Sequence, residues 1–307
     1  MKKMKTLRTA ALAFIAVIAF GLLSVQLKHA QQPSPTPSPT PLPPTLGLEQ
    51  GYLEFDTPQF KVKLVKASQT MAALQTKGAE GFDFTPGDRL ERRAANGYHH
   101  LGDLTLRLRT GNTGPWQKYD TAEARKAVQS LQTSGHSLAI ADLTPTLPAD
   151  IPVQIWRSWI EWEDGLILRF EIKNRTSEPV QIGALGIPMI FNNIITGRNL
   201  KESHESCSFS DPYIGEDAGY LQVTRLNGHG PALIVVPDQN ASFEAYQLLS
   251  EPMRPNQTFE GSFAWMVHTQ AYADQEWKGV EQWVTPTHVE ILPGATRAYS
   301  VDRKSVV

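Results

Sequence analysis

Residues 153–173 have the sequence VQIWRSWIEWEDGLILRFEIK, and this stretch decides the fold class. Apolar and polar residues alternate along Leu166–Lys173, which is the pattern of a strand with one buried face. Val153–Glu163 is rich in β-branched and aromatic residues, although its two faces are less cleanly separated. Asp164-Gly165 between them is a strong hairpin signal. The stretch therefore predicts two long antiparallel strands.

Strand patterns continue on both sides of this hairpin. Asn174–Pro179 has turn composition and the apolar run Val180–Leu185 follows it, so we expect three neighbouring strands in a meander. Further strands are expected at Phe60–Lys66, Leu104–Arg109, Ser137–Asp142, Tyr220–Leu226, Ala232–Pro237, Phe259–His268, Val289–Leu292 and Arg297–Val301. Helical composition is confined to Ala122–Leu131, Asn192–Ser206 and Gln270–Lys278. We predict an all-β domain over residues 48–301, a large antiparallel β-sandwich with few short helices.

Residues 1–32 have the layout of a secretory signal. Basic residues precede the uncharged apolar run Ala10–Val25, as in signals that enter the translocon. Ala30 is an acceptable last residue of the signal, but Lys28 occupies a position where a small residue is preferred. An uncleaved N-terminal anchor is therefore the alternative. In either case we expect an exported protein, periplasmic or extracellular, with membrane contact only through an uncleaved N-terminal segment.

Residues 33–47 contain PSPTPSPTPLPPT, a segment rich in proline, serine and threonine. Regularly spaced prolines disfavour helix and sheet and favour extended polyproline II structure. We expect this segment to be a semi-rigid linker between the N-terminal segment and the folded domain.

The charge and the absent motifs exclude several classes of function. The chain of 307 residues has 29 basic and 31 acidic residues, which does not favour nucleic acid as a partner. Its one cysteine, Cys207, excludes an intrachain disulfide. The sequence has no phosphate loop, no H-E-x-x-H zinc motif, no G-x-S-x-G elbow and no C-x-x-C pair. We expect neither a cofactor nor a bound metal.

The segment from Glu244 to Trp283 combines aromatic and acidic residues. Aromatic rings stack on the C–H faces of sugars while carboxylates and histidine bind hydroxyl groups, so this composition favours a glycan-binding surface. The binding candidates in it are Trp265, His268, Tyr272, Trp277 and Trp283. The alternative is that Trp265 and Trp277 fill the core. Glycoside hydrolysis would need two facing carboxylates, for which Glu260 and Glu276 are the weak candidates.

Three other polar groups have structural and functional interpretations. Asp211 and Tyr213 begin an acidic loop that suits ligand binding, calcium or an interface with another domain. His99, His100 and Asp103 lie close together, and a turn in which Asp103 caps the next strand is favoured over a metal site. Cys207 lies near His204, but a lone cysteine is more often a small buried apolar residue than a nucleophile.

Several short segments together resemble the domain of unknown function 5695 family of large exported bacterial proteins. They are FDFTPGDRL (82–90), NGYHHLGD (96–103), GALGIPM (183–189), DPYIG (211–215), AGY (218–220) and Glu276-Trp277 with Trp283. The resemblance runs from Gly51 to Tyr299. It implies a supersandwich of the galactose-mutarotase-like kind, followed in family members by a helical toroid that resembles those of glycoside hydrolases.

The resemblance implies that this domain is a non-catalytic part of a carbohydrate-active protein. It would bind polysaccharide or oligosaccharide, or dock against a C-terminal helical domain that the chain lacks. The alternatives are a purely structural domain and a stand-alone polysaccharide hydrolase or lyase. The last six residues, 302–307, have the sequence that a common sequencing adapter encodes (GAT CGG AAG AGC GTC GTG). We therefore expect an artefactual tail there, and an open reading frame that continues past Val301.

Overall fold

The computed structural model describes residues 46–77, 81–163, 165–238, 240–249 and 260–306. The predicted signal or anchor and nearly all of the predicted linker lie outside these residues. The strands are β1 Tyr52–Asp56, β2 Phe60–Val65, β3 Met71–Thr76, β4 Thr105–Thr110, β5 Gln117–Asp120, β6 Gln129–Leu131, β7 Ser137–Asp142, β8 Val153–Trp162, β9 Gly165–Asn174, β10 Val180–Met189, β11 Ser208–Tyr213, β12 Tyr220–Arg225, β13 Ala232–Pro237, β14 Ala245–Leu248, β15 Phe263–His268, β16 Val289–Ile291 and β17 Thr296–Val306. The helices are α1 Leu90–Ala95, α2 Thr121–Ala124, α3 Leu200–Ser206 and α4 Gln270–Ala273, with 3-10 turns at Leu48–Gln50, Gly87–Arg89 and Thr144–Thr146.

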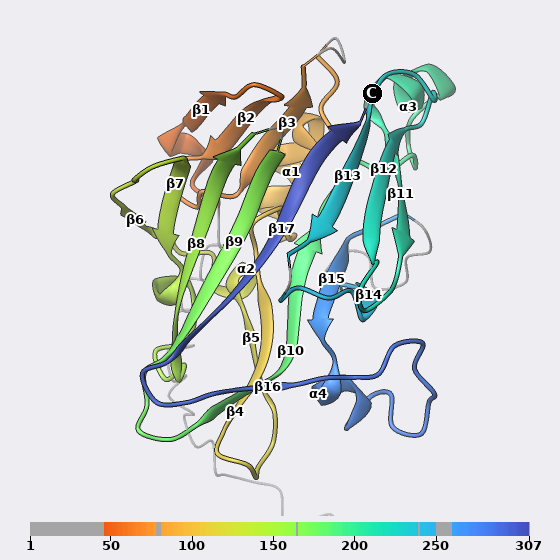
Figure 1. Cartoon of the computed structure of the whole chain (residues 1–307). Coiled ribbons are helices and arrows are strands. Elements are labelled where there is room, and N and C mark those ends of the chain that lie inside the picture. Colours follow the sequence, from red (N-terminus) through yellow and green to blue (C-terminus); the bar gives the residue numbers. More distant parts are fainter. Residues whose placement is uncertain (1–45, 78–80, 164, 239, 250–259, 307) are drawn as a thin grey trace, which may run out of the picture. The chain divides into compact units, whose positions relative to one another are not determined.

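The strands form three antiparallel sheets (Figure 1). The largest has eight strands in the order β11-β12-β13-β17-β9-β8-β7-β6. The second has six strands, ordered β14-β15-β10-β4-β5 with β16 paired to β10, and the third is β1-β2-β3. One apolar core contains residues of all three sheets, such as Phe60, Leu106 and Phe170. The all-β sandwich with few short helices is therefore confirmed.

The β8–β9 hairpin forms as the sequence predicts. Val153 pairs with Asn174 and Trp162 with Gly165, so the two strands are in register along their whole length. Asp164 itself lies outside the described residues. The core face of β9 carries Leu166 and three further apolar side chains at alternate positions, all fully buried. Burial of this face provides most of the hydrophobic driving force for the pairing.

The predicted three-stranded meander is wrong in its third strand. β10 does not pair with β9; it crosses into the six-stranded sheet and pairs with β4, β15 and β16. Every residue of β10 is buried, so both faces of this strand are covered. Its unbroken apolar sequence, GALGIPM after Val180-Gln-Ile, fits a central strand with two covered faces rather than a strand with one solvent face.

The last strand extends further than the sequence pattern predicts. β17 was expected over Arg297–Val301, but it continues to Val306, pairing with β9 on one side and β13 on the other. Residues 302–306 therefore have regular strand structure, whereas the expected domain boundary was at residue 301. The adapter origin of these residues stays a prediction.

The short helices occupy only parts of the segments that were expected to be helical. α3 begins after Asn199, whose side chain accepts from the backbone N–H of Glu202 while the Glu202 carboxylate accepts from the Asn199 N–H. α2 ends at Ala124, and the rest of the predicted helix at Ala122–Leu131 contains β6 instead. Within the described ranges, no helix is long and apolar enough to cross a membrane.

Candidate functional site

The segment after β15 covers part of the outer face of the six-stranded sheet, the face turned away from the main core. β15 ends at His268, and α4 follows after the single residue Thr269; Figure 1 shows the helix directly after this strand. Ala271 of α4 is fully buried in a small second cluster with Ala184 of β10 and Ala264 and Met266 of β15. Because three of these four side chains are alanines, the helix lies close to the sheet and its flanking polar residues reach the side chains of β4.

A stack of three side chains lies at this edge. The guanidinium of Arg107 is 3.7 Å from the ring centre of Tyr272. The other neighbour of Tyr272 is Trp277, with ring centres 4.8 Å apart and planes inclined by 24°. Arg107 also donates to both carboxylate oxygens of Glu276, at 2.7 and 2.5 Å. This bidentate pair fixes the guanidinium, and through it the two rings.

A second aromatic–arginine contact lies on the same sheet face. The indole N–H of Trp116 donates to Asp274 Oδ2 at 2.9 Å. Arg109 lies over the Trp116 ring at 4.1 Å, and its Nε donates to Gln181. We call the group Arg107, Trp116, Tyr272, Asp274, Glu276 and Trp277 the α4 surface. It joins residues of β4 and the β4–β5 turn to residues that follow β15.

The carboxylates of this surface are ionised at neutral pH. The hydrogen bond from Arg107 lowers the pKa of Glu276, and the hydrogen bond from Trp116 lowers the pKa of Asp274. Burial raises the pKa of Tyr272, so its hydroxyl stays protonated. The surface therefore offers hydrogen-bond acceptors and apolar rings, but no carboxylic acid that retains its proton for general acid catalysis.

Two tryptophans after α4 remain accessible. Trp277 is partly exposed, with Tyr272 against one side of its ring. Trp283 is 90% exposed, an unusual state for the largest apolar side chain. Both were predicted as binding residues, and the structure places both in the same loop between α4 and β16.

Trp265 is a core residue, which was the alternative that the sequence left open. It is fully buried in β15 and stacks on Phe243 with ring centres 3.8 Å apart. Its indole N–H donates to the backbone oxygens of Ala241 and Ser242. No part of the ring is available to a ligand.

His268 is also buried, in a polar network that holds β15 to β17 and to the segment before β16. Its Nδ1 is 2.7 Å from Thr287 Oγ1 and its Nε2 is 3.0 Å from the Tyr299 hydroxyl. Glu244, which was not singled out as a site residue, is buried beside it and accepts from Thr269 and Thr287. Burial lowers the pKa of His268 to about 4 and raises the pKa of Glu244. The network is satisfied internally, as expected of a structural one.

The two weak catalytic candidates lie at opposite ends of β15. Glu260 precedes the strand and accepts from the backbone N–H groups of Ile195 and Thr196 at 3.2 and 3.0 Å. Glu276 follows α4 beyond the other end and is held by Arg107. A strand of this length spans roughly 20 Å, more than the 5–9.5 Å that separates the carboxylates of glycoside hydrolases. These two residues do not form a hydrolytic pair.

Asp211 and Tyr213 lie on a different sheet. Both belong to β11, an edge strand of the eight-stranded sheet. The Tyr213 hydroxyl donates to Asp211 Oδ2 at 3.0 Å, and the ring of Tyr213 stacks on that of Tyr220 in the neighbouring strand at 4.3 Å. This pair is an exposed cross-strand contact on the eight-stranded sheet, whereas the α4 surface lies on the six-stranded sheet, so we treat the two as separate.

The remaining polar groups are structural. Asp103 accepts from the His100 N–H, which is the expected turn, and also binds the buried Arg125 at 2.7 Å. Burial raises the pKa of Asp103, but the Arg125 charge outweighs it and the pKa falls well below its usual range. Cys207 is fully buried and burial raises its thiol pKa, which argues against a nucleophile. In the described part of the chain, no cluster of His, Cys, Asp or Glu is placed to hold a metal ion.

The sequence did not identify Arg107 or Trp116 as site residues. Arg107 had one signal: it occupies the polar face of an alternating strand, Leu104–Arg109. Nothing local shows which distant segment covers that face. The contact with Tyr272 and Glu276 depends on the pairing of β4 with β10 and of β10 with β15, which is a tertiary property.

Several solved structures resemble this fold. A polysaccharide lyase superposes with a TM-score of 0.58 at 12% identity, and the match covers 82% of this chain and 33% of the lyase. A putative aldose 1-epimerase from Escherichia coli K12 gives 0.49 at 10% identity, covering 83% and 98%. A galactose mutarotase-like protein from Lactobacillus casei gives 0.45 at 11% identity, covering 83% and 100%. At these identities the likeness is one of fold alone.

This chain spans about a third of the length of the lyase whose structure it resembles. The sequence comparisons give the family. No curated protein matches the sequence. A model of the family of unknown function DUF5695 matches residues 63–305, which is most of the chain. The protein therefore belongs to the DUF5695 family.

Proposed function

We propose that this domain is a non-catalytic glycan-binding module that holds a saccharide against the α4 surface and against Trp283, which is in the same loop as Trp277. The observation that carries the proposal is the stack of Arg107, Tyr272 and Trp277. In this stack Tyr272 is enclosed between the guanidinium and the indole, so the outermost ring is that of Trp277. A ring held in this way offers a rigid apolar face at little entropic cost.

The polar groups around the stack suit sugar hydroxyls. Glu276 and Asp274 are ionised and lie at the rim of the aromatic group, where each can accept hydrogen bonds from a ligand. Trp283 supplies a second apolar surface in the same loop. Aromatic faces next to acceptors match the alternation of C–H faces and hydroxyl groups on a pyranose.

Binding is favoured over catalysis by the state of the carboxylates. A glycosidase needs one carboxyl group that keeps its proton near neutral pH and a second one within reach of the same bond. Glu276 and Asp274 both have lowered pKa values, and Glu260 is bound elsewhere. We expect the isolated domain to bind glycans weakly and to catalyse no hydrolysis.

The test is a glycan-binding screen on the purified chain, followed by titration of the best ligand against Trp277→Ala and Trp283→Ala. We expect each variant to weaken binding by about tenfold, since a lost stacking contact corresponds to roughly 1.4 kcal/mol. Trp162→Ala is the matched control, because Trp162 is a tryptophan 50% exposed at the end of β8 on another sheet.

Binding that is lost in the Trp277 and Trp283 variants and kept in the Trp162 variant would support the proposal. Unchanged binding in both loop variants, or equal losses in all three, would contradict it. Turnover of a polysaccharide by the purified chain would favour a stand-alone hydrolase or lyase instead.

We also propose that the domain is exported and acts within a larger carbohydrate-active protein. The basic residues and apolar run at the N-terminus support export. The match to one third of a polysaccharide lyase supports a place as one module among others. Immunoblots of the fractionated source cells test both points: we expect the protein outside the cytoplasm and well above 34.1 kDa. A cytoplasmic band at the mass of this chain would contradict them.

A further inference from the structure

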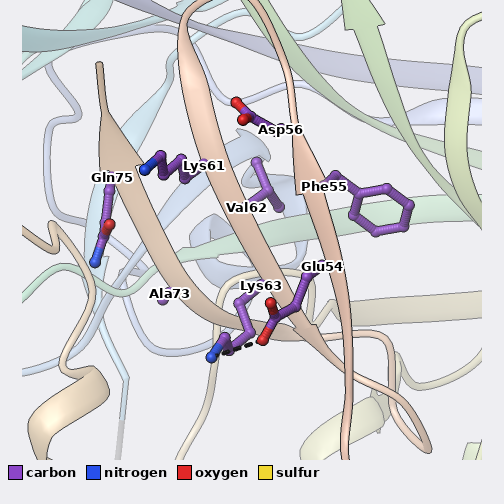
Figure 2. Close-up of a pocket in the computed structure, with 8 residues that line it drawn as sticks. All are labelled: Glu54, Phe55, Asp56, Lys61, Val62, Lys63, Ala73 and Gln75. Carbon is purple, nitrogen blue, oxygen red and sulfur yellow. Dashed lines mark ion pairs between the residues drawn. The ribbon is translucent and has the colours of Figure 1, made fainter. Parts of the chain in front are cut away.

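The groove on the sheet of β1, β2 and β3 is balanced in charge. Its volume is about 410 Å³, and Figure 2 shows the residues that line it. Within it Lys63 binds Glu54 at 2.9 Å, the ion pair that the figure marks. Asp56 binds Lys77 at 2.6 Å, and both this hydrogen bond and the nearby Lys61 charge lower the Asp56 pKa. Since each carboxylate has a lysine partner, we propose no ligand for this groove.

A smaller, polar cavity lies where β8 meets the segment between β2 and β3 and the segment after α2. Arg157 of β8, Ser68 and Thr70 between β2 and β3, and Arg125 and Lys126 after α2 all line it. Its volume of about 10 Å³ has room for one water molecule or one small ion. No residue of the α4 surface lines this cavity, so it is separate from the proposed glycan site.

Arg157 is fully buried, and the described hydrogen bonds of its side chain go to neutral groups. It donates to the backbone oxygens of Gly102 and Ser68 at 2.6 Å each. Its Nε has no hydrogen-bond partner among the described residues. Burial lowers the pKa of Arg157 to about 10, which reflects the cost of keeping the cation away from water. An anion beside this guanidinium would offset that cost.

Asp103 is the one carboxylate among the described residues that line the cavity, and it is engaged by Arg125. The Arg125 guanidinium donates to it at 2.7 Å, and the Thr121 hydroxyl donates to the same oxygen at 3.0 Å. The Asp103 charge also acts on Arg157, where it raises the pKa against the effect of burial. The lining therefore has three cationic side chains, Arg125, Lys126 and Arg157, and one carboxylate, which leaves an excess of positive charge.

Donors that a ligand can use come from three segments around the cavity. The first is the Arg157 Nε–H. Ser68 Oγ and Thr70 Oγ1 are 2.8 Å apart and share one proton, so the proton of the other hydroxyl is available. The third is the exposed ammonium of Lys126. A water molecule needs acceptors as well as donors, whereas a halide ion only accepts, so this set of groups favours an anion.

We propose that this cavity binds a chloride ion, held by Arg157 and by the free hydroxyl of the Ser68–Thr70 pair, with Lys126 at its exposed side. The ion neutralises the buried guanidinium. It also connects β8 to the segment between β2 and β3, and so stabilises the folded chain. The proposal is independent of glycan binding.

The first test is the thermal midpoint of the full chain in sodium chloride and in sodium methanesulfonate, each at about 0.1 M so that charge screening is equal. Methanesulfonate is too large for the cavity. Because a ligand that binds only the folded state stabilises it, we expect the midpoint in chloride to be about 2–4 °C higher.

Arg157→Met should abolish this difference between the two salts. Arg303→Met is the matched control, because Arg303 is a second fully buried arginine and does not line the cavity. Each variant is compared with itself in the two salts, so a lower midpoint of Arg157→Met does not affect the result. Lys126 is exposed, so Lys126→Gln should fold and should reduce the difference, whereas Lys278→Gln, at an exposed lysine after α4, should keep it.

Crystals grown in sodium bromide locate the ion. We expect an anomalous bromine peak in the cavity next to Arg157, and no such peak there in Arg157→Met. The proposal is overturned if no bromine peak lies in the cavity, if the midpoints in the two salts are equal, or if Arg157→Met and Arg303→Met respond alike to chloride. Electron density in the cavity without an anomalous signal would identify a water molecule and would likewise overturn it.

Discussion

Trp265 and Trp277 belong to the same aromatic and acidic segment, yet their surroundings are opposite. Trp265 is on the core face of β15, fully buried against Phe243, with its N–H bonded to backbone. Trp277 follows α4 in the loop before β16, where it is partly exposed and stacks on Tyr272. The comparison shows that one segment can hold a tryptophan in the core and another at the surface, where we propose that it binds glycan. Removing the Trp265 ring should therefore affect stability, and removing the Trp277 ring should affect glycan binding.

The largest expected effect is on stability at Trp265. Trp265→Ala leaves a cavity in the core and removes the indole N–H that donates to the backbone oxygens of Ala241 and Ser242. The free energy of unfolding should therefore fall by about 3–5 kcal/mol. Trp277→Ala should change it by less than about 1 kcal/mol. Urea denaturation of both variants checks this. Similar losses in the two variants would mean that Trp277 is also a core residue.

The next effect extends the comparison to two fully buried arginines near Trp159. Arg157 donates to the backbone oxygens of Gly102 and Ser68 at 2.6 Å each. The guanidinium of Arg303 lies 5.6 Å from the Trp159 ring centre, and none of its nitrogens has a hydrogen-bond partner among the described residues. Burial lowers the pKa of Arg303 to about 10, which reflects the cost of keeping this charge away from water.

Replacing each arginine by methionine should therefore have opposite effects. Arg303→Met removes a buried cation whose nitrogens have no hydrogen-bond partner among the described residues, and it should stabilise the fold by about 1–4 kcal/mol. Arg157→Met leaves two buried carbonyl groups without donors and should destabilise it by a similar amount. Thermal unfolding of the two variants measures both signs. A destabilising Arg303→Met would show that this side chain has a partner that the described contacts do not include.

A smaller effect concerns pH and the buried end of β15. The pKa of His268 is about 4 in the folded protein and near 6.5 in the unfolded chain. Between these values the unfolded state binds more protons, so this group lowers stability as the pH falls from 6.5 to 4, by up to about 3 kcal/mol. Glu244, whose pKa is raised, opposes part of this change.

The contribution of His268 is isolated by a variant. His268→Gln keeps a polar side chain beside Thr287 and Tyr299 but cannot take up the proton. Its unfolding free energy should depend less steeply on pH than that of the original protein between pH 4 and 6.5. Equal slopes in the two proteins would contradict the buried, uncharged state of this histidine.

The smallest expected effect on stability is at the Arg107–Glu276 pair. The Glu276 carboxylate is half exposed, so Glu276→Gln should cost less than about 1 kcal/mol of stability. Glycan binding should fall several-fold, because the guanidinium that positions Tyr272 and Trp277 loses its bidentate partner. Titration with the ligand of the original protein checks this, with Glu171→Gln as the control, since Glu171 forms an exposed pair with Arg169 on another sheet. Equal binding by the two variants would show that the stack does not need this ion pair.

The sequence was sufficient for elements with a local signal and not for contacts between distant strands. Alternation and Asp164-Gly165 predicted the β8–β9 hairpin with nearly correct ends. The predicted pairing of β10 with β9 was wrong, because a turn after β9 does not show whether the next strand stays in the same sheet. The glycan-binding role of the aromatic segment stays a prediction, and its division into core and surface residues depends on which face β15 turns to the core. Arg107 joined the site only through strand pairing.

The most direct test of the glycan-binding role is a paired measurement on Trp277→Ala: its affinity for the best glycan ligand and its thermal midpoint, each relative to Trp162→Ala. We predict an affinity about tenfold lower with a midpoint within about 2 °C of the control. An affinity equal to that of the control would contradict the α4 surface as a glycan-binding site. A large drop in the midpoint would instead place Trp277 with Trp265 in the core.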